Sequence, residues 1–137
     1  MKKVVGLDVG TKTIGVAKGF CETQMIFPLC TLKRKSVKRD AEKLVDICIK
    51  EGVSLVVLGL PLRADGSEGR MARLARQIGN ALKEQTELEV VYQDESDSSL
   101  EAQERLYAAN RHSRYHKAVI DQEAAIVIVE RWFLENA

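Results

Sequence analysis

The sequence predicts a mixed α/β domain built on one five-stranded sheet in the order 3-2-1-4-5, with helices on both faces. The first third of the chain reads as an antiparallel meander of three strands, and helix and strand patterns alternate after it. Residues 55–58 are apolar on both faces, which is typical of a central strand covered on both sides. At 137 residues the chain is expected to form one domain over 1–137, with right-handed crossovers.

An acid inside an apolar strand is the most informative feature of the N-terminal segment. Over residues 4–9 side chains alternate, so Asp8 shares a face with Gly6 and lies opposite to Leu7. A turn after residue 9 then predicts a second strand over 13–17. A carboxylate in such a strand is costly unless a cation or a proton neutralises it, so this hairpin indicates a metal-handling or phosphate-handling edge. The simpler alternative is that Asp8 caps the turn.

The next elements follow from local signals. Pro28 cannot donate a ladder hydrogen bond, so residues 25–32 are expected to form an edge strand. Ser36 is the expected N-cap of an amphipathic helix, and Gly52 its stop. A buried strand over 53–58 comes next and completes a strand-helix-strand unit.

The loop over 59–69 lies at the carboxyl end of that strand, where α/β proteins commonly bind ligands. It lacks the lysine and the glycine spacing of a P-loop. A helix over 70–85 is expected to turn five side chains inward: Met71, Leu74, Ala75, Ile78 and Leu82. A strand over 88–93 should follow it.

The last part of the chain combines a capping box with a second misplaced acid. Ser98 and Glu101 predict a helix start, and residues 110–117 read as a mobile, basic loop. The final helix has its inward stripe at helical spacing: Asp121, Ala124, Ala125, Ile128, Val129 and Trp132. Asp121 therefore occupies a position where an apolar residue is expected, and the alanines one turn later permit close packing on a sheet.

Composition excludes several classes of protein. Hydrophobic residues make up 45% and charged residues 30%, and no apolar run approaches the ~20 residues of a membrane span. No secretory signal is recognisable, so we expect a cytoplasmic protein without a membrane partner. The three cysteines, Cys21, Cys30 and Cys48, lack metal-binding spacing and read as small hydrophobes.

Basic residues gather in clusters although the net charge is only +1. The simpler interpretation of any one cluster is solvated surface. The alternative is a surface that follows a nucleic-acid backbone. The clusters are Lys33, Arg34, Lys35, Lys38 and Arg39; Arg70, Arg73 and Arg76; and Arg111, Arg114 and Lys117.

Three acids from separate elements, Asp8, Glu95 and Asp121, can converge in a domain of this kind. Carboxylates that are packed together repel one another unless a hard cation lies between them, which favours Mg²⁺ or Mn²⁺. A pair of such ions suits phosphodiester hydrolysis, so we interpret the three acids as catalytic and metal-binding residues. The nucleic-acid-binding residues would be Lys12, Arg70, Arg73, Arg111, Arg114 and Lys117.

Four motifs in order carry a family resemblance: LDVGTKTIGVA, VLGLPLRADGSE, QDE and IDQEAA. In this combination, the chain resembles the YqgF family of nucleases that are similar to Holliday junction resolvases. The resemblance implies a ribonuclease-H-like fold, action on the precursor of small-subunit ribosomal RNA, and acidic site residues at Asp8, Glu95 and Asp121. One departure is Ser96-Asp97, where the family usually has Arg followed by Leu or Tyr, so we expect weak cleavage that Ser96→Arg improves.

The resulting expectation is a metal-dependent endonuclease that processes the 5′ end of pre-16S rRNA, with branched DNA as the alternative substrate. We expect a ribosomal precursor particle as partner, and a monomer or a homodimer. A non-catalytic RNA-binding module of the same fold is a further alternative. The first motif also resembles the phosphate loop of actin-like and sugar-kinase ATPases, but 137 residues do not supply their second domain.

Overall fold

The structure, a computed structural model, describes residues 2–94 and 116–136, with the backbone alone for 116–121. It contains a five-stranded sheet in the order β3-β2-β1-β4-β5, which confirms the predicted order. No helix within these ranges is long and apolar enough to span a membrane. The elements are β1 (Lys3–Val9), β2 (Thr13–Phe20), β3 (Ile26–Lys33), α1 (Val37–Glu51), β4 (Leu55–Leu60), α2 (Arg70–Gln85), β5 (Glu89–Asp94) and α4 (His116–Asn136).

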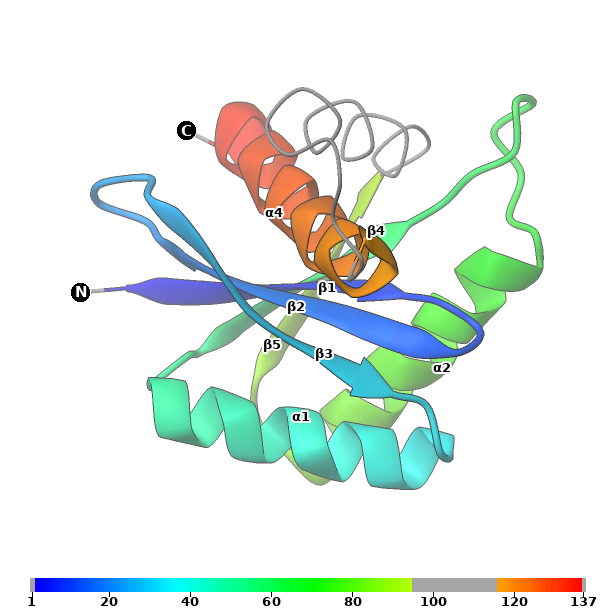
Figure 1. Cartoon of the computed structure of the whole chain (residues 1–137), viewed down its shortest axis with the longest axis horizontal. Helices are drawn as coiled ribbons and strands as arrows, with labels where there is room; N and C mark the ends of the chain where they lie inside the picture. The colour runs from blue at the N-terminus through cyan, green and yellow to red at the C-terminus, as the bar shows by residue number, and fades with distance from the viewer. Residues whose placement is uncertain (1, 95–115, 137) are drawn as a thin grey trace.

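Helices cover both faces of the sheet, as predicted. Figure 1 shows α4 on one side and α1 with α2 on the other. Each face has its own core because side chains alternate along the strands. Val5 and Leu7 of β1 belong to the core under α1 and α2, whereas Val4 packs with Val129 and Phe133 of α4.

The strand pairings explain why the two halves of the sheet differ. β1 and β2 are antiparallel, as are β2 and β3, while β4 pairs in parallel with both β1 and β5. Every residue of β4 is buried, as expected for a strand between two neighbours and two layers of helices. β3 is an edge strand that contains Pro28, and its pairing with β2 is irregular between Val16 and Ala17.

The ends of α1 form as their sequence predicts. Ser36 accepts a hydrogen bond from the backbone N–H of Arg39 (3.2 Å), and Gly52 adopts the left-handed conformation with φ of 68°. The inward face of α2 was predicted only in part. Met71 and Leu74 are partly exposed, and the buried face instead consists of Ala72, Ala75, Ile78, Gly79 and Leu82. These smaller residues let the helix lie closer to the sheet, with Gly79 against Tyr92 and Leu58.

Candidate functional site

Asp8 lies on the side of the sheet where the three parallel strands β1, β4 and β5 have their carboxyl ends. This side is called the carboxyl edge below. Asp8 is partly exposed and stands one residue beyond the pair formed by Leu7 of β1 and Leu58 of β4. Further along the same edge, Gly59 pairs with Gln93 of β5. Parallel strands bring their carboxyl ends to the same side of the sheet, so Asp8 of β1 and Asp94 at the end of β5 lie on that side, with β4 between them.

Two glycines allow α4 to lie directly on the strands beside Asp8. A Cβ atom at Gly6 would overlap a methyl group of Val129 and lie 2.9 Å from the backbone oxygen of Ala125. A Cβ at Gly19 of β2 would lie 2.8 Å from Val129 Cγ1. Any larger residue would push the helix away. Because Gly6 and Asp8 are two positions apart on one strand, Asp8 is on the α4 side of the sheet.

The direction of α4 brings its first turns toward Asp8. The pair Val4 and Gly19 lies under Val129 and Phe133, and the next row, which contains Gly6, lies under Ala125. In the following row, Asp8 pairs with Gly15 of β2, and Gly15 pairs with Thr31 of β3. The hydroxyl of Thr31 accepts a hydrogen bond from the side chain of Gln122 in α4 (3.0 Å). At the other end of the helix, Gln93 donates to Glu135 (2.7 Å), which fixes α4 across the sheet.

The backbone of Asp121 therefore lies in the turn of α4 that covers the row of Asp8. Asp121 precedes Ala125 by one helical turn and is adjacent to Gln122. Its side chain, and the whole of Glu95, lie outside the described residues. Among the side chains that the structure describes, no three His, Cys, Asp or Glu residues form a metal-binding group. The predicted cluster of three carboxylates thus stays a prediction, for which the backbone supplies two of the three positions.

Three of the predicted nucleic-acid-binding cations are exposed near this edge. Lys12 lies in the turn between β1 and β2, and Arg70 and Arg73 lie in the first turn of α2. Lys117 lies in the first turn of α4, with its side chain outside the described part. Arg111 and Arg114 fall outside that part altogether.

The predicted loop over 110–117 is wrong at its C-terminal end, because His116 and Lys117 are already helical. No glycine or proline interrupts the chain from there to residue 136, so the helix begins before its apolar stripe does.

Arg76 is not a free member of the arginine cluster on α2. Its guanidinium forms two hydrogen bonds with the carboxylate of Glu68 (2.5 and 2.6 Å) and lies over the ring of Tyr92 at 4.7 Å. The hydrogen bond from Arg76 lowers the pKa of Glu68 below its usual range. Arg76 therefore anchors the loop over 61–69 to α2, while its proposed role as a phosphate contact stays a prediction.

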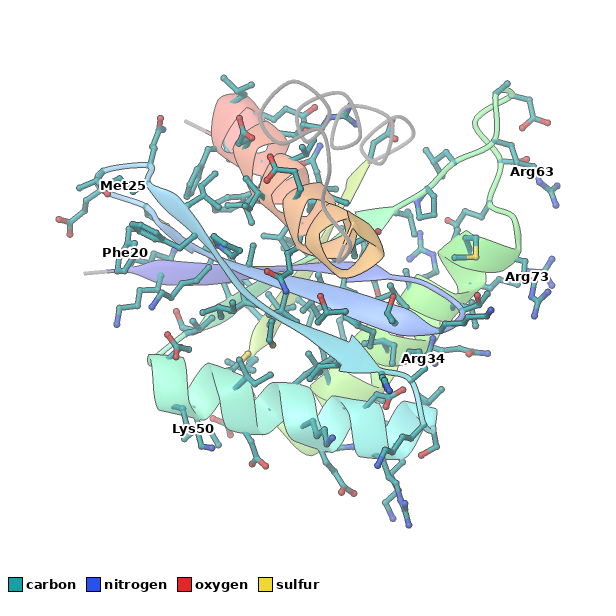
Figure 2. All side chains as sticks on the ribbon, viewed as in Figure 1. Phe20, Met25, Arg34, Lys50, Arg63 and Arg73 are labelled. Atoms are coloured by element: carbon teal, nitrogen blue, oxygen red, sulfur yellow. The ribbon has the colours of Figure 1, made fainter. Side chains whose placement is uncertain are left out.

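That loop is an ordered hairpin which presents a cation that sequence reasoning missed. Leu62 pairs with Glu68, and the N–H of Arg63 donates to the carbonyl of Ser67 (2.8 Å). Asp65 accepts hydrogen bonds from the backbone and the side chain of Ser67, which lowers its pKa. Figure 2 shows the exposed Arg63 on the same side of the molecule as Arg73. The signal for Arg63 was its place within the motif VLGLPLRADGSE, between two turn-forming stretches.

A family model described as a Holliday junction resolvase, RuvX, matches residues 2–135. Relatives named "Putative pre-16S rRNA nuclease" include one from Crocosphaera subtropica, 37% identical over 93% of this chain and 90% of the relative. Another, from Thermosynechococcus vestitus, is 39% identical over 96% of this chain and 87% of the relative. These matches confirm the resemblance that the four motifs carry.

Solved structures agree on the fold. RuvC from Thermus thermophilus superimposes with a TM-score of 0.60 at 12% identity, over 97% of this chain and 95% of that one. T. thermophilus RuvC in complex with a Holliday junction gives 0.54 at 14% identity, over 90% and 92%. At such identities the likeness concerns the fold alone, and it confirms the ribonuclease-H-like prediction. Together with the match over nearly all its length, this means that the chain belongs to the RuvX Holliday junction resolvase family.

Proposed function

We propose that the chain is a divalent-metal-dependent endonuclease that acts on structured RNA and processes the 5′ end of pre-16S rRNA. The observation that carries the proposal is the placement of Asp8. It is a partly exposed carboxylate at the carboxyl edge of the sheet, in the row covered by the turn of α4 that contains Asp121. The names of the relatives point to the RNA substrate.

The donor set fits a hard cation. Asp8, Glu95 and Asp121 offer carboxylate oxygens only, and Mg²⁺ and Mn²⁺ prefer oxygen ligands. When bound, such ions supply activation of water and stabilisation of the leaving oxygen.

The protein itself fixes the positions of the proposed metal ligands. The backbone of Asp8 is held by its pairing with Gly15 of β2, one residue beyond the ladder of β1 with β4. Close packing on Gly6 and Gly19 fixes α4 relative to the strand. Asp8 and the backbone of Asp121 thus lie on a strand and a helix that pack together, and fixed positions of this kind are required for orienting a phosphodiester.

Binding of the polyanion is assigned to the cations that surround the edge. Lys12, Arg70 and Arg73 are exposed, and Arg63 adds a fourth contact from the 61–69 hairpin. Arg111, Arg114 and Lys117 belong to the same proposal through the segment that leads into α4. Affinity must arise from such local groups because the chain as a whole carries a net charge of only +1.

The test is cleavage of two substrates by the purified protein: a structured RNA with the 5′ end of pre-16S rRNA, and a four-way DNA junction. We expect cleavage of the RNA with Mg²⁺ or Mn²⁺ and none with a chelator. Asp8→Asn should abolish it, leave the fold intact, and raise stability without metal by relieving charge repulsion. Asp46→Asn, an exposed acid on the outer side of α1, is the matched control and should cleave normally.

Other outcomes select other functions. Preferential cleavage of the junction would favour the resolvase activity that the family model names. Metal-independent binding of RNA without any cleavage would favour a binding module and would contradict the nuclease proposal. Mass measurement in solution would decide between a monomer and a homodimer, and co-sedimentation with ribosomal precursor particles from a cytoplasmic extract would test the proposed partner.

A further inference from the structure

A buried ion pair lies beneath the turn that follows Asp8. Asp40, near the start of α1, is 2% exposed, and within the described ranges it is the one charged residue among the buried ones. Arg34 Nε donates to Asp40 Oδ2 over 2.7 Å, and both side chains are largely shielded from water. Burying such a pair costs desolvation, so a well-packed apolar pair would serve stability equally well. The role of this ion pair therefore lies in the neighbouring backbone groups that it binds.

The pair holds the turn between β1 and β2. Arg34 Nη1 donates to the carbonyl of Gly10 (2.8 Å), and the backbone N–H of Arg34 donates to the carbonyl of Lys12 (2.8 Å). Asp40 also accepts from the N–H of Lys35 (3.0 Å), which fixes the short connection between β3 and α1 that carries Arg34. Figure 2 shows Arg34 between the end of β3 and the start of α1. Both ends of the turn are thereby held by Arg34, which binds Gly10 through its guanidinium and Lys12 through its backbone N–H.

The geometry requires arginine. One guanidinium nitrogen meets the carboxylate while another meets the carbonyl of Gly10. The ammonium of a lysine is a single point donor on a flexible stem and cannot occupy both positions. Two residues before Gly10 is Asp8, and two residues after it is Lys12, so the fastened carbonyl lies midway between a proposed metal ligand and a proposed phosphate contact.

A second ion pair shows that tying the sheet to α1 does not by itself require this arrangement. Lys18 of β2 and Glu51 at the end of α1 form an ion pair of 2.6 Å that is more exposed. It lies at the other end of β2 and touches nothing in the turn. The Lys18–Glu51 pair joins β2 to α1, whereas the Arg34–Asp40 pair joins the segment after β3 to α1 and alone of the two reaches the residues around Asp8.

We propose that Arg34 and Asp40 are positioning residues: they fix the turn over 10–12 and thereby set the positions of Asp8, the proposed metal ligand, and of Lys12, the proposed phosphate contact. The activity part of this inference rests on the proposed nuclease function. The part that concerns the conformation of the turn does not rest on that function, and it can be measured separately.

The first experiment is amide hydrogen exchange of the full chain. The reporters are the backbone N–H of Gly10, which donates to the carbonyl of Thr13, and the backbone N–H of residue 34, which donates to the carbonyl of Lys12. Arg34→Lys should raise exchange at both about tenfold or more, because a local opening replaces a fixed turn. The N–H of Val53, bonded to the carbonyl of Cys48, should be unchanged. Unchanged exchange at Gly10 would overturn the inference, whatever the activity.

The second experiment separates positioning from stability. The double variant Arg34→Met with Asp40→Leu replaces the pair by apolar groups and should fold as well as the wild type. Its single-turnover cleavage at saturating protein should still fall on the order of 10- to 100-fold, because a small misplacement of reacting groups has effects of that size. Substrate binding without metal should weaken less than threefold. The control, Lys18→Met with Glu51→Gln, should cleave at the wild-type rate.

The outcomes remain distinguishable. A double variant that folds, loses protection at Gly10 and cleaves slowly supports the inference, whereas one that folds and cleaves normally overturns it. If the double variant does not fold, Arg34→Lys and Asp40→Asn are assayed at a temperature where unfolding curves show them native. If the wild type cleaves neither substrate, the proposed function fails, and hydrogen exchange alone decides whether the pair fixes the turn.

Discussion

Gly6→Ala would test whether α4 is held at its present height above β1. The added methyl would lie 2.9 Å from the carbonyl oxygen of Ala125 and overlap a methyl group of Val129. Side chains can rotate, but a helix carbonyl cannot move without the helix. α4 must therefore shift by several tenths of an ångström, and the shift is transmitted to the turn of Asp121 because the helix is rigid over one turn.

The magnitude follows from these contacts. Overpacking of a tight core by one methyl group destabilises proteins by roughly 1–3 kcal/mol. We expect a loss of this size, together with cleavage slowed by on the order of tenfold or more, since Asp8 and Asp121 separate. Val129→Ala removes the closer of the two contacts, so the double variant with Gly6→Ala should recover part of the stability, and the two effects should not be additive.

The assay combines urea unfolding with single-turnover cleavage at a temperature where each variant is folded. Val5→Ala is the matched control, because it weakens the same strand on the opposite face, away from α4. It should lose a similar ~1–3 kcal/mol while cleaving at nearly the wild-type rate. Wild-type stability and rate for Gly6→Ala would refute the reasoning, and so would an equal slowing by Val5→Ala.

Three further predictions concern other parts of the molecule. Arg63→Ala with Arg73→Ala should flatten the dependence of log affinity on log salt by about 0.7 to 0.9 per contact, while Lys50→Ala, at the far end in Figure 2, should leave the slope unchanged. Gly79→Ala should destabilise the fold by roughly 1–3 kcal/mol in urea unfolding, because its methyl would overlap the Tyr92 hydroxyl and lie 3.1 Å from Leu58 Cδ1. Burial raises the pKa of the Cys48 thiol from 9.0 to about 11, so the unfolded chain ionises first, and the free energy of unfolding should fall between pH 9 and 11. Cys48→Ala should remove that part of the pH dependence.

Local signals were enough to predict most of the fold. Ser36, Gly52 and Pro28 act through their immediate neighbours, so the ends of α1 and the edge position of β3 could be predicted from sequence. The apolar run of β4 predicted a covered central strand for the same reason. The helical face of α2 could not be derived in this way. Its orientation depends on Gly79 meeting Tyr92, a contact between separate elements.

The candidate site shows the same division. Asp8 was recognisable because an acid interrupts an apolar strand. The role of Arg34 was not, because a run of basic residues reads as solvated surface, and its partner Asp40 is buried only after β3 and α1 pack together. Likewise, Arg76 was grouped with its helical neighbours, although Glu68 in the preceding loop binds it. Pairing partners that lie apart in sequence leave no periodic signal.

The contact of Gly6 with α4 has a consequence for how the chain acquires its activity. Gly6 and Ala125 lie 119 positions apart in the sequence, so their contact closes one of the longest loops in the fold. Contacts between residues so far apart in the sequence form late in folding, because closing the long loop carries an entropic cost before the contact can stabilise the fold. Asp8 belongs to the local β1–β2 hairpin, whereas the turn of Asp121 comes over the row of Asp8 only through the docking of α4 on Gly6. On the proposed assignment, hydrolysis therefore requires that this long-range contact has formed.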